Sequence, residues 1–533
     1  LPSALSLCRL APNRWSEATK LLELPPIWMS LQWAPQLIAM LYEPHGVIVA
    51  PLLVRLAQEY PQALYFPFQV SKSALEKHEG IRNDPIRRDA LRTISAALQS
   101  PHIERLVAGF ANLHNPNLRM KDCVQEIRSL LDEGRGDEAA DLFVSEQKAW
   151  MRPAVDDRGP LYVDFCNKFV PELEKVCGRD GAKLRANPAA CKKEFNTLVK
   201  AWEGYEKLKD YHGKAASRNK VGESLSQWSS YLYRYHSADA PSGRLTSIEL
   251  PGQYRGDRPP DPSTHVTIEC ISTQLMVMSS LRVPKRVTLH GSDQREYRFL
   301  CKGGEDLRLD QRVQIMFGAM NRTLDEHAPA ASRGLGMTTY QVLPLSEHVG
   351  LIEWVDGTKT LRGLIEEEAT ARREAAMAQM KQIGRGGNNA AKGPFDITAQ
   401  IKYCGDKDGL HKGGLNANCF KSRAAVDRRT IVKGFEAVEA CMRPDLLSRA
   451  VASLSVSPEV YLSMRSQFAR SLANLTACAH VLGIGDRHLE NFLLSTATGR
   501  IVGIDFGHSF GSATYALPVP ELMGVRLTRQ LTS

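Results

Sequence analysis

Two short polar segments that flank one apolar run constrain the fold of this chain most strongly. Residues 483–491 read Gly-Ile-Gly-Asp-Arg-His-Leu-Glu-Asn, and the apolar run after Asn491 ends in Asp505-Phe506-Gly507. The side-chain oxygens of Asn491 and Asp505 are hard donors of the kind that Mg²⁺ prefers. The carboxylate of Asp486 is suited to orienting a hydroxyl and taking its proton. The pattern therefore predicts phosphoryl transfer from a metal-bound triphosphate; the alternative is a polar turn before a buried strand.

A third segment offers a cation for the phosphates. Lys302 directly follows the strand-like residues Arg298–Cys301, from which a lysine can reach the α- and β-phosphates if a carboxylate holds it in place. Glu305 and Asp310 follow within a few residues and provide two such carboxylates. Taken alone, Lys302 is better explained as a surface lysine. Together with the two polar segments, it favours a phosphate-binding role.

The order of residues in the first polar segment indicates a family. Ordinary protein kinases have His-Arg-Asp before the asparagine, whereas Asp486-Arg487-His488 reverses that order. This segment resembles the catalytic loop, Gly-Asp-Arg-His-x-x-Asn, of the phosphatidylinositol 3-kinase and related-kinase superfamily. The resemblance implies Asp486 as the base, His488 as a contact to the transferring phosphate, and Asn491 and Asp505 as metal ligands. It also implies ATP and Mg²⁺, or Mn²⁺ in its place, as cofactors.

The same resemblance extends to the nucleotide-binding lobe. It implies Asp310 as the acid that pairs with Lys302, with Glu305 nearby, although Leu309 stands where the related kinases usually have Gln. A glycine-rich phosphate loop is missing from the sequence, and a serine-bearing segment with a downstream proline takes its place. We expect the hydroxyl of Ser280 and neighbouring N–H groups to hold a phosphate oxygen.

Adenine requires a flat apolar slot and backbone hydrogen bonds at a hinge. Trp354 offers a ring for stacking, and the backbone groups of Glu353 and Val355 can pair with the edge of the base. Analogy with the family adds five residues that would line the slot, for which plain core packing is an equally good explanation. These residues are Leu300, Tyr340, Ile352, Leu493 and Ile504.

The composition limits the class of protein, its compartment and its partners. A chain of 533 residues can hold two or three domains, and its 43% hydrophobic and 24% charged residues are typical of a globular protein. It contains no apolar run of bilayer-spanning length and no secretory signal, so we expect no membrane partner. The 11 cysteines lack any Cys-x-x-Cys pair, which suits reduced thiols in the cytosol or nucleus. The net charge of +9 permits acidic partners without requiring them.

The pattern along the chain predicts an α+β fold. Residues 1–245 carry apolar residues mainly at helical spacing, and the family resemblance implies a helical solenoid of the FAT type there. Short strand-like runs and one helix in residues 246–355 predict a kinase N-lobe ending in the hinge. Residues 356–533 predict part of a helical C-lobe, with an insertion near 366–430 whose Gly- and Lys-rich tracts (384–393 and 402–414) favour a mobile loop.

The segment after Asp505-Phe506-Gly507 bears on the substrate. Lipid kinases of the family attract phosphorylated inositol with basic residues there, but residues 511–525 contain no Lys or Arg. An apolar segment with prolines favours a protein Ser or Thr as the acceptor. Four segments are similar to one subgroup of the family, which acts at DNA ends: residues 60–64, 249–254, 280–286 and 508–530.

Membership of that subgroup would imply phosphorylation of Ser or Thr, preferably before Gln, in the nucleus. It would also imply recruitment by the Ku heterodimer to DNA ends in non-homologous end joining, through regions that this chain does not contain. Three alternatives remain: a related kinase of checkpoint or growth signalling, a non-catalytic scaffold with a kinase-like fold, and a lipid kinase. The scaffold is disfavoured because it has no chemical need for Lys302, Asp486, Asn491 and Asp505 together.

The ends of the chain suggest a piece of a longer protein. It begins with Leu1 rather than Met, and it stops at Ser533, shortly after the activation segment. The family resemblance implies further C-lobe helices and a terminal FATC element. Because catalytic geometry tolerates little looseness, we expect the isolated fragment to be inactive or poorly folded.

Overall fold

The computed structural model describes most of the chain as two compact units. It covers residues 14–151, 157–204, 220–240, 245–382 and 443–517, apart from 255, 257 and 281, and also 429, 436, 521, 525 and 527–532. The first unit comprises residues 1–311 and 341–354, and the second comprises 312–340 and 355–533. Helices, then a sheet, then further helices confirm the predicted α+β class. Both tracts expected to be mobile, 384–393 and 402–414, lie outside the described residues.

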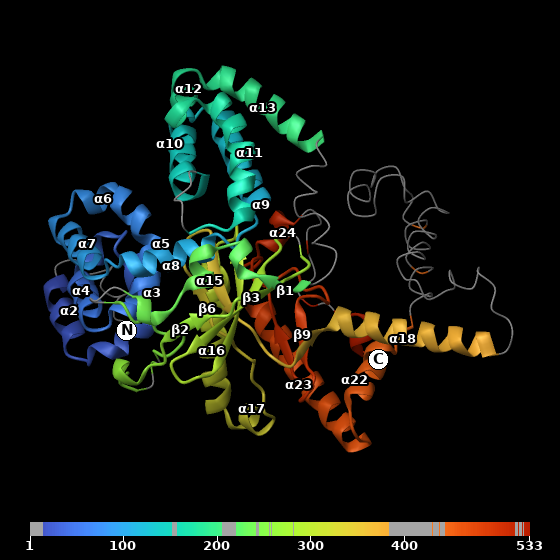
Figure 1. Ribbon diagram of the computed structural model, residues 1–533. Coiled ribbons are helices and arrows are strands. Elements are labelled where there is room, and N and C mark those ends of the chain that lie inside the picture. Colours follow the sequence, from blue (N-terminus) through green and yellow to red (C-terminus); the bar gives the residue numbers. More distant parts are fainter. Residues whose placement is uncertain are drawn as a thin grey trace. The chain divides into compact units, whose positions relative to one another are not determined.

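The first unit begins with two groups of helices (Figure 1). Several of them start at a capping residue followed by proline: the side chains of Asp84, Ser100 and Asn115 each accept a backbone N–H of the first turn. Proline at the first helical position loses no hydrogen bond, so these pairs set the helix starts. The first group is α2 (Trp15–Glu23), α3 (Ala34–Met40), α4 (Ala50–Glu59), α5 (Pro61–Lys77), α6 (Glu79–Arg82), α7 (Pro85–Ala97) and α8 (Pro101–Ala111). The second is α9 (Pro116–Asp132), α10 (Gly136–Glu146), α11 (Pro160–Cys177), α12 (Ala182–Ala186) and α13 (Pro188–Gly204).

An antiparallel sheet of seven strands follows in the same unit. Its order is β1-β3-β4-β5-β7-β6, and β2 pairs with β4 beside this path. Alternate residues of β4 are buried, as a strand with one covered face requires. The strands are β1 (Lys220–Ser224), β2 (Ile268–Ile271), β3 (Gln274–Val277), β4 (Lys285–Gly291), β5 (Glu296–Gly303), β6 (Val342–Pro344) and β7 (Val349–Glu353).

One apolar cluster joins the first helical group to this sheet. It includes Leu53 and Phe68 from α4 and α5, Phe110 from α8, and Leu289 and Leu351 from the sheet. Helix α8 contacts β7, and the thiol of Cys301 on β5 donates to the carbonyl of Phe110 at 3.6 Å. Helices α9–α13 enclose a second apolar cluster. The helices and the sheet thus share a core, which ties the position of β5 to the helical part.

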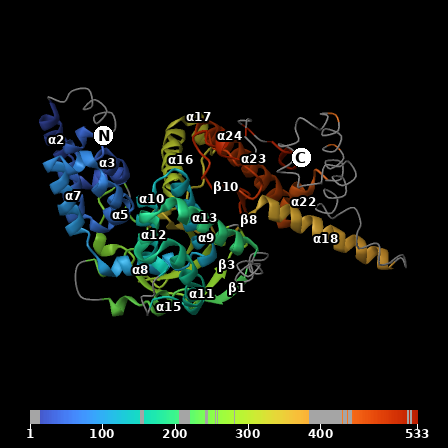
Figure 2. The same cartoon turned by 90° about the horizontal axis from the view of Figure 1, so that it is seen from above.

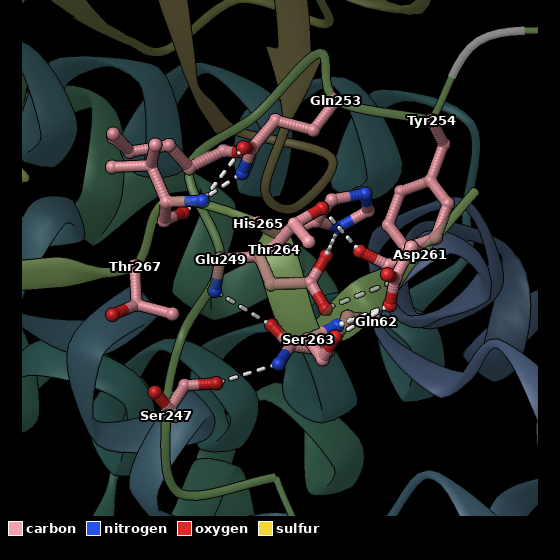
Figure 3. Close-up of polar contacts among 12 residues, drawn as sticks. Gln62, Ser247, Glu249, Gln253, Tyr254, Asp261, Ser263, Thr264, His265 and Thr267 are labelled. Atoms are coloured by element: carbon pink, nitrogen blue, oxygen red, sulfur yellow. Dashed lines mark hydrogen bonds and ion pairs between the residues drawn. The ribbon is translucent and has the colours of Figure 1, made fainter. Parts of the chain in front are cut away.

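A polar cluster attaches the segment before β2 to helix α5 (Figure 3). Gln62 of α5 donates to the carbonyl of Ser247 at 2.5 Å and accepts the N–H of Glu249 at 2.8 Å. The Glu249 carboxylate contacts the Tyr254 hydroxyl at 3.0 Å and Nδ1 of His265 at 2.8 Å. Burial, followed by the neighbouring Glu249 charge, raises the pKa of Tyr254. Because these polar groups satisfy one another, the 249–254 segment has a fixed path along the helices.

The second unit contains most of α16 (Arg308–Glu326), which begins in the first unit, and a small three-stranded sheet of order β10-β9-β8. Helix α18 packs against α22 (Figures 1 and 2), and α23 contacts β10. The other elements are α17 (Ala328–Ser332), β8 (Thr358–Thr360), α18 (Leu361–Gln382), α22 (Leu446–Leu454), α23 (Pro458–Val481), β9 (Phe492–Ser495), β10 (Ile501–Gly503), α24 (Ala513–Ala516) and α25 (Arg529–Thr532).

One strand lies where the sequence predicts helices. Strand β1 falls within residues 1–245, and it pairs with β3 across a register shift between Val221 and Glu223. Gly222 has a φ of +81°, a conformation that favours glycine. The strand therefore depends on its β3 partner rather than on a local apolar alternation. Among the described helices, none has a stretch long and apolar enough to cross a membrane.

Candidate functional site

A β-hairpin in the second unit brings the two proposed metal ligands together. Asn491 immediately precedes β9, and Asp505 follows β10 after Ile504. The strands pair antiparallel with Gly503 opposite Phe492, and the N–H of Ile504 donates to the carbonyl of Asn491 at 3.1 Å. The antiparallel register therefore returns the chain to its starting end, so Asn491 and Asp505 lie at the same end of the hairpin.

The catalytic-loop acid is tied to the same point. The side-chain N–H of Asn491 donates to the backbone carbonyl of Asp486 at 2.8 Å, and Asn491 is 5% exposed. This bond leaves Oδ1 of Asn491 to act as an acceptor. Asp486 and Asp505 both have positive φ values, +57° and +60°. Such backbone costs about 1–3 kcal/mol per residue and is found mostly where a functional geometry demands it.

Arg487 connects the two polar segments. Its guanidinium donates to the carbonyl of Gly485 at 2.8 Å, to that of Ile504 at 2.9 Å, and also to that of Asp505. It also lies over the ring of Phe506, with 5.1 Å between its Cζ and the ring centroid. Burial lowers the pKa of Arg487, and the charges of Asp505 and Asp486 act in the opposite direction. Arg487 was given no role from the sequence, although it stands inside the motif.

His488 faces Asp486 with one ring nitrogen. Its Nδ1 accepts the backbone N–H of Glu490 at 3.2 Å, so in the neutral ring Nε2 carries the proton. Nε2 lies 4.0 Å from Oδ2 of Asp486, and the His488 side chain is 42% exposed. The imidazole is therefore oriented as a donor beside the carboxylate.

Phe506 anchors the second segment in the core. It is fully buried, and its ring meets that of Phe317 on α16 edge to face, with centroids 5.4 Å apart. The hydroxyl of Ser509 donates to the carbonyl of Phe506 at 2.8 Å. Because the neighbouring Asp505 is exposed while Phe506 is buried, the backbone between them is held with the carboxylate outward.

The first unit carries the residues expected to bind phosphates. Lys302 lies on β5, and its Nζ donates to Oε2 of Glu305 at 2.9 Å. Glu305 is therefore a carboxylate that holds this lysine, and Asp310, 5% exposed in the first turn of α16, stays a prediction in that role. Ser280 is exposed, and its carbonyl accepts the N–H of Val283, whose φ is +48°. This turn shapes the serine-bearing loop between β3 and β4.

The residues expected at the hinge are also placed. The N–H of Glu353 donates to Gln341 at 2.8 Å and that of Trp354 to Arg298 at 2.9 Å, so both donors are used within the sheet. Leu300 and Ile352 are direct cross-strand partners, both half-buried. The guanidinium of Arg286 lies 5.2 Å from the centroid of the Trp354 ring. An adenine stacked on Trp354 would therefore share that ring with Arg286.

The predicted residues divide between the two units. Those in the first unit are Ser280, Leu300, Lys302, Glu305, Asp310, Ile352, Glu353 and Trp354. The set in the second is Tyr340, Val355, Asp486, His488, Asn491, Leu493, Ile504 and Asp505. In the second set, Tyr340 is buried and Leu493 pairs with Val502 on β10 and Thr360 on β8. Glu521 was not predicted, yet its carboxylate accepts the backbone N–H of Asp486.

Comparison with known proteins shows which family the chain resembles. Residues 296–533 match the family described as phosphatidylinositol 3- and 4-kinase. The chain is 37% identical to the DNA-dependent protein kinase catalytic subunit of Dictyostelium discoideum, over 95% of the chain and 11% of that protein. It is 34% identical to the same subunit of Mus musculus, over 97% of the chain and 12% of that protein. It is 27% identical to the serine/threonine-protein kinase TOR of Arabidopsis thaliana, over 93% of the chain and 18% of that protein. The chain thus spans only a small part of the length of these relatives, and the predicted family resemblance is confirmed.

Proposed function

We propose that this chain, which carries a domain of the phosphatidylinositol 3- and 4-kinase family over residues 296–533, is the catalytic part of a protein serine/threonine kinase of the DNA-dependent type. The observation that carries the proposal is the end of the β9–β10 hairpin. There Asn491, Asp505 and the backbone of Asp486 are connected by hydrogen bonds, partly through Arg487. This arrangement suits phosphoryl transfer, which depends mainly on positioned oxygen ligands and one base.

The side chains fit a divalent cation held together with a nucleotide. Asn491 keeps Oδ1 as an acceptor and Asp505 offers an exposed carboxylate, so both donors are hard oxygens. The described residues contain no group of three or more His, Cys, Asp or Glu side chains that could hold a metal ion. A cation such as Mg²⁺, or Mn²⁺ in its place, would therefore take its remaining ligands from phosphates and water.

ATP with this cation supplies the phosphoryl group and neutralises its charge. Asp486 accepts the proton of the attacking hydroxyl and orients that hydroxyl. His488, with a proton on Nε2, donates a hydrogen bond toward the transferring phosphate. Lys302, held by Glu305, attracts the α- and β-phosphates, and the turn at Ser280 offers its hydroxyl and nearby N–H groups.

The hinge would hold the adenine base. Because the N–H groups of Glu353 and Trp354 already donate within the sheet, we assign base pairing to the Glu353 carbonyl and the Val355 N–H. The remaining lining residues are Leu300, Tyr340, Ile352, Leu493 and Ile504.

The acceptor proposed is a Ser or Thr of a protein, preferably before Gln. The absence of Lys and Arg from residues 511–525 supports this choice over an inositol lipid, and so do the names of the most similar relatives described above. The names of these relatives state a dependence on DNA. From the family resemblance we further propose a role in the nucleus at DNA ends, with the Ku heterodimer, in non-homologous end joining. A growth-signalling kinase is the second candidate, because the TOR relative matches nearly the whole chain at lower identity.

Transfer of labelled phosphate from ATP by the full-length protein tests the proposal. A Ser-Gln peptide, a Ser-Ala peptide and phosphatidylinositol vesicles are compared with and without Ku and linear DNA, with Asp486→Asn as the inactive control. We expect labelling of the Ser-Gln peptide that rises with DNA ends. DNA-independent peptide labelling would favour the growth-signalling candidate, lipid labelling would favour a lipid kinase, and labelling unaffected by Asp486→Asn would refute the catalytic assignment.

A further inference from the structure

A polar relay runs from helix α9 to the phosphate-binding lysine in the first unit. Nη1 of Arg282, in the serine-bearing loop, lies 2.7 Å from Oδ2 and 2.9 Å from Oδ1 of Asp122 on α9. Nε of Arg282 also lies 3.7 Å from Oε1 of Glu305. The other carboxylate oxygen of Glu305 accepts from Nζ of Lys302 at 2.9 Å. An acid 160 residues upstream of the loop thus shares one network with the lysine.

The backbone after Lys302 packs directly on the same part of the helical region. A Cβ on Gly303 would lie 2.5 Å from Cβ of His114, and one on Gly304 would lie 2.9 Å from Oδ2 of Asp122. Gly304 also has a φ of +78°. Glycine permits this close approach, so the end of β5 packs against His114 and Asp122 in addition to the polar contacts of the relay.

The other end of the loop is anchored as well. Lys285, the first residue of β4, is 1% exposed, and its Nζ lies 4.0 Å from the centroid of the Trp228 ring. Trp228 and Asp122 both precede strands β2–β7, which lie within residues 268–353. Arg282 and Lys285, on the serine-bearing loop and at its end, therefore contact residues that lie outside 246–355, the range predicted to form the kinase N-lobe.

The role inferred for Asp122 follows from the charges around Glu305. Glu305 stands between two cations, the nearer of which is Lys302. While Asp122 engages Arg282 at 2.7 Å, the contact of Arg282 with Glu305 stays long. Without that acid, the guanidinium is free to form a bidentate pair with Glu305, since this geometry is the preferred one for Arg and carboxylate. Lys302 would then lose part of the charge that orients it.

We propose that Asp122 is a positioning residue for nucleotide binding, acting through Arg282 and Glu305 on Lys302 and on the serine-bearing loop. The proposal rests on the proposed kinase function. In this proposal α9 contributes to the free energy of nucleotide binding, although Asp122 contacts neither the nucleotide nor the reacting atoms. A displacement of α9 would change the affinity for ATP with little effect on the chemical step.

The test is steady-state kinetics of the full-length protein with varied ATP and saturating peptide. Asp122→Asn keeps the shape of the side chain and removes its charge. We expect the KM for ATP to rise about tenfold with kcat within about twofold, because the lost interaction serves binding alone. Asp122→Glu should recover most of the affinity. The matched control is Asp132→Asn, which lies on α9 like Asp122 and breaks an exposed ion pair with Lys192 of α13. This variant should keep the wild-type KM.

A double-mutant cycle with Arg282→Gln keeps the proposal testable if one variant folds poorly. Adding Asp122→Asn to Arg282→Gln should raise the KM for ATP no further, since the two residues act as a pair. Additive effects on KM, or a wild-type KM in Asp122→Asn, would overturn the relay. A fall in kcat that follows the loss of folded protein would assign Asp122 a structural role only. Absence of any ATP-dependent transfer by the wild type would instead refute the proposed function.

Discussion

At the residue scale, Arg487 determines how the two polar segments of the second unit are held together. It binds the carbonyls of Gly485, Ile504 and Asp505, and no lysine side chain can donate to all three in that geometry. Hydrogen bonds from a charged donor contribute about 1.5–3 kcal/mol each. We therefore expect Arg487→Lys to lower kcat for peptide phosphorylation at least tenfold, since about 1.4 kcal/mol corresponds to a factor of ten in rate.

The matched control for this prediction is Arg362→Lys. Arg362 pairs with Glu366 and Glu490 at 2.8 and 2.9 Å, but its side chain is 56% exposed. Exposed ion pairs contribute little to stability, so kcat should stay near the wild-type value. Equal activity of Arg487→Lys and wild type would show that the two segments keep their geometry without this guanidinium.

Lys285 gives a pH dependence of stability that can be measured directly. Burial lowers the pKa of Lys285 to about 7 in the folded protein, from 10.5 for a lysine exposed to water. Between these two values the unfolded chain binds more protons, so the free energy of unfolding rises with pH, by up to about 1.4 kcal/mol per unit. Below pH 7 the charged lysine is present in both states, and its burial costs stability in full.

Urea denaturation of the wild type and Lys285→Met, followed from pH 7 to pH 10, measures this contribution. We expect the wild type to gain stability relative to the variant as the pH rises, because methionine has no proton to lose. Parallel curves would mean that the face of Trp228 keeps the ammonium protonated in the fold, and the lowered pKa would then be wrong.

At the scale of elements, the β9–β10 hairpin depends on one hydroxyl of α23. Oγ of Ser471 accepts the N–H of Ile501 at 2.9 Å, and Ser471 is 5% exposed. Ser471→Ala would leave that N–H buried without a partner, which costs about 1–3 kcal/mol. We expect the free energy of unfolding of the second unit to fall by this amount, and peptide phosphorylation to fall with it.

Ser466→Ala on the same helix is the control, because Ser466 is exposed. Denaturant titration should leave its midpoint close to the wild-type value. If Ser471→Ala behaves like Ser466→Ala, the hairpin is held by its apolar contacts alone.

Some strands and helices could be predicted from the sequence, and others could not. Strands β2–β5 and helix α16 were predicted because their apolar residues alternate or recur locally. Strands β1 and β8 were not, because Lys220–Ser224 and Thr358–Thr360 are short and polar and become strands only through their partners β3 and β9. The proposed metal ligands, Asn491 and Asp505, could be named from the sequence because each belongs to a contiguous motif. Asp122 was not, since 160 residues separate it from Arg282 and no local pattern connects them.

At the scale of the whole molecule, the residues assigned to ATP are shared between the units. Lys302 belongs to the first unit, and Asp486, Asn491 and Asp505 belong to the second. Under the proposed function, ATP at a hundred times its Kd should stabilise the folded state that binds it by about 2.7 kcal/mol in total. We expect ATP with Mg²⁺ to raise every thermal transition of the wild-type protein in calorimetry. Stabilisation confined to one transition would show that one unit binds the nucleotide without the other.

The most direct test of the account separates binding from chemistry at two carboxylates. ATP affinity and single-turnover phosphate transfer are measured for the wild type, Asp486→Asn and Asp505→Asn in the full-length protein. We expect Asp486→Asn to bind ATP normally but to transfer phosphate at least about a hundredfold more slowly, the usual contribution of a general base. Asp505→Asn should lose the dependence of ATP binding on Mg²⁺. Wild-type transfer by Asp486→Asn, or unchanged Mg²⁺ dependence in Asp505→Asn, would contradict the assignment of this site.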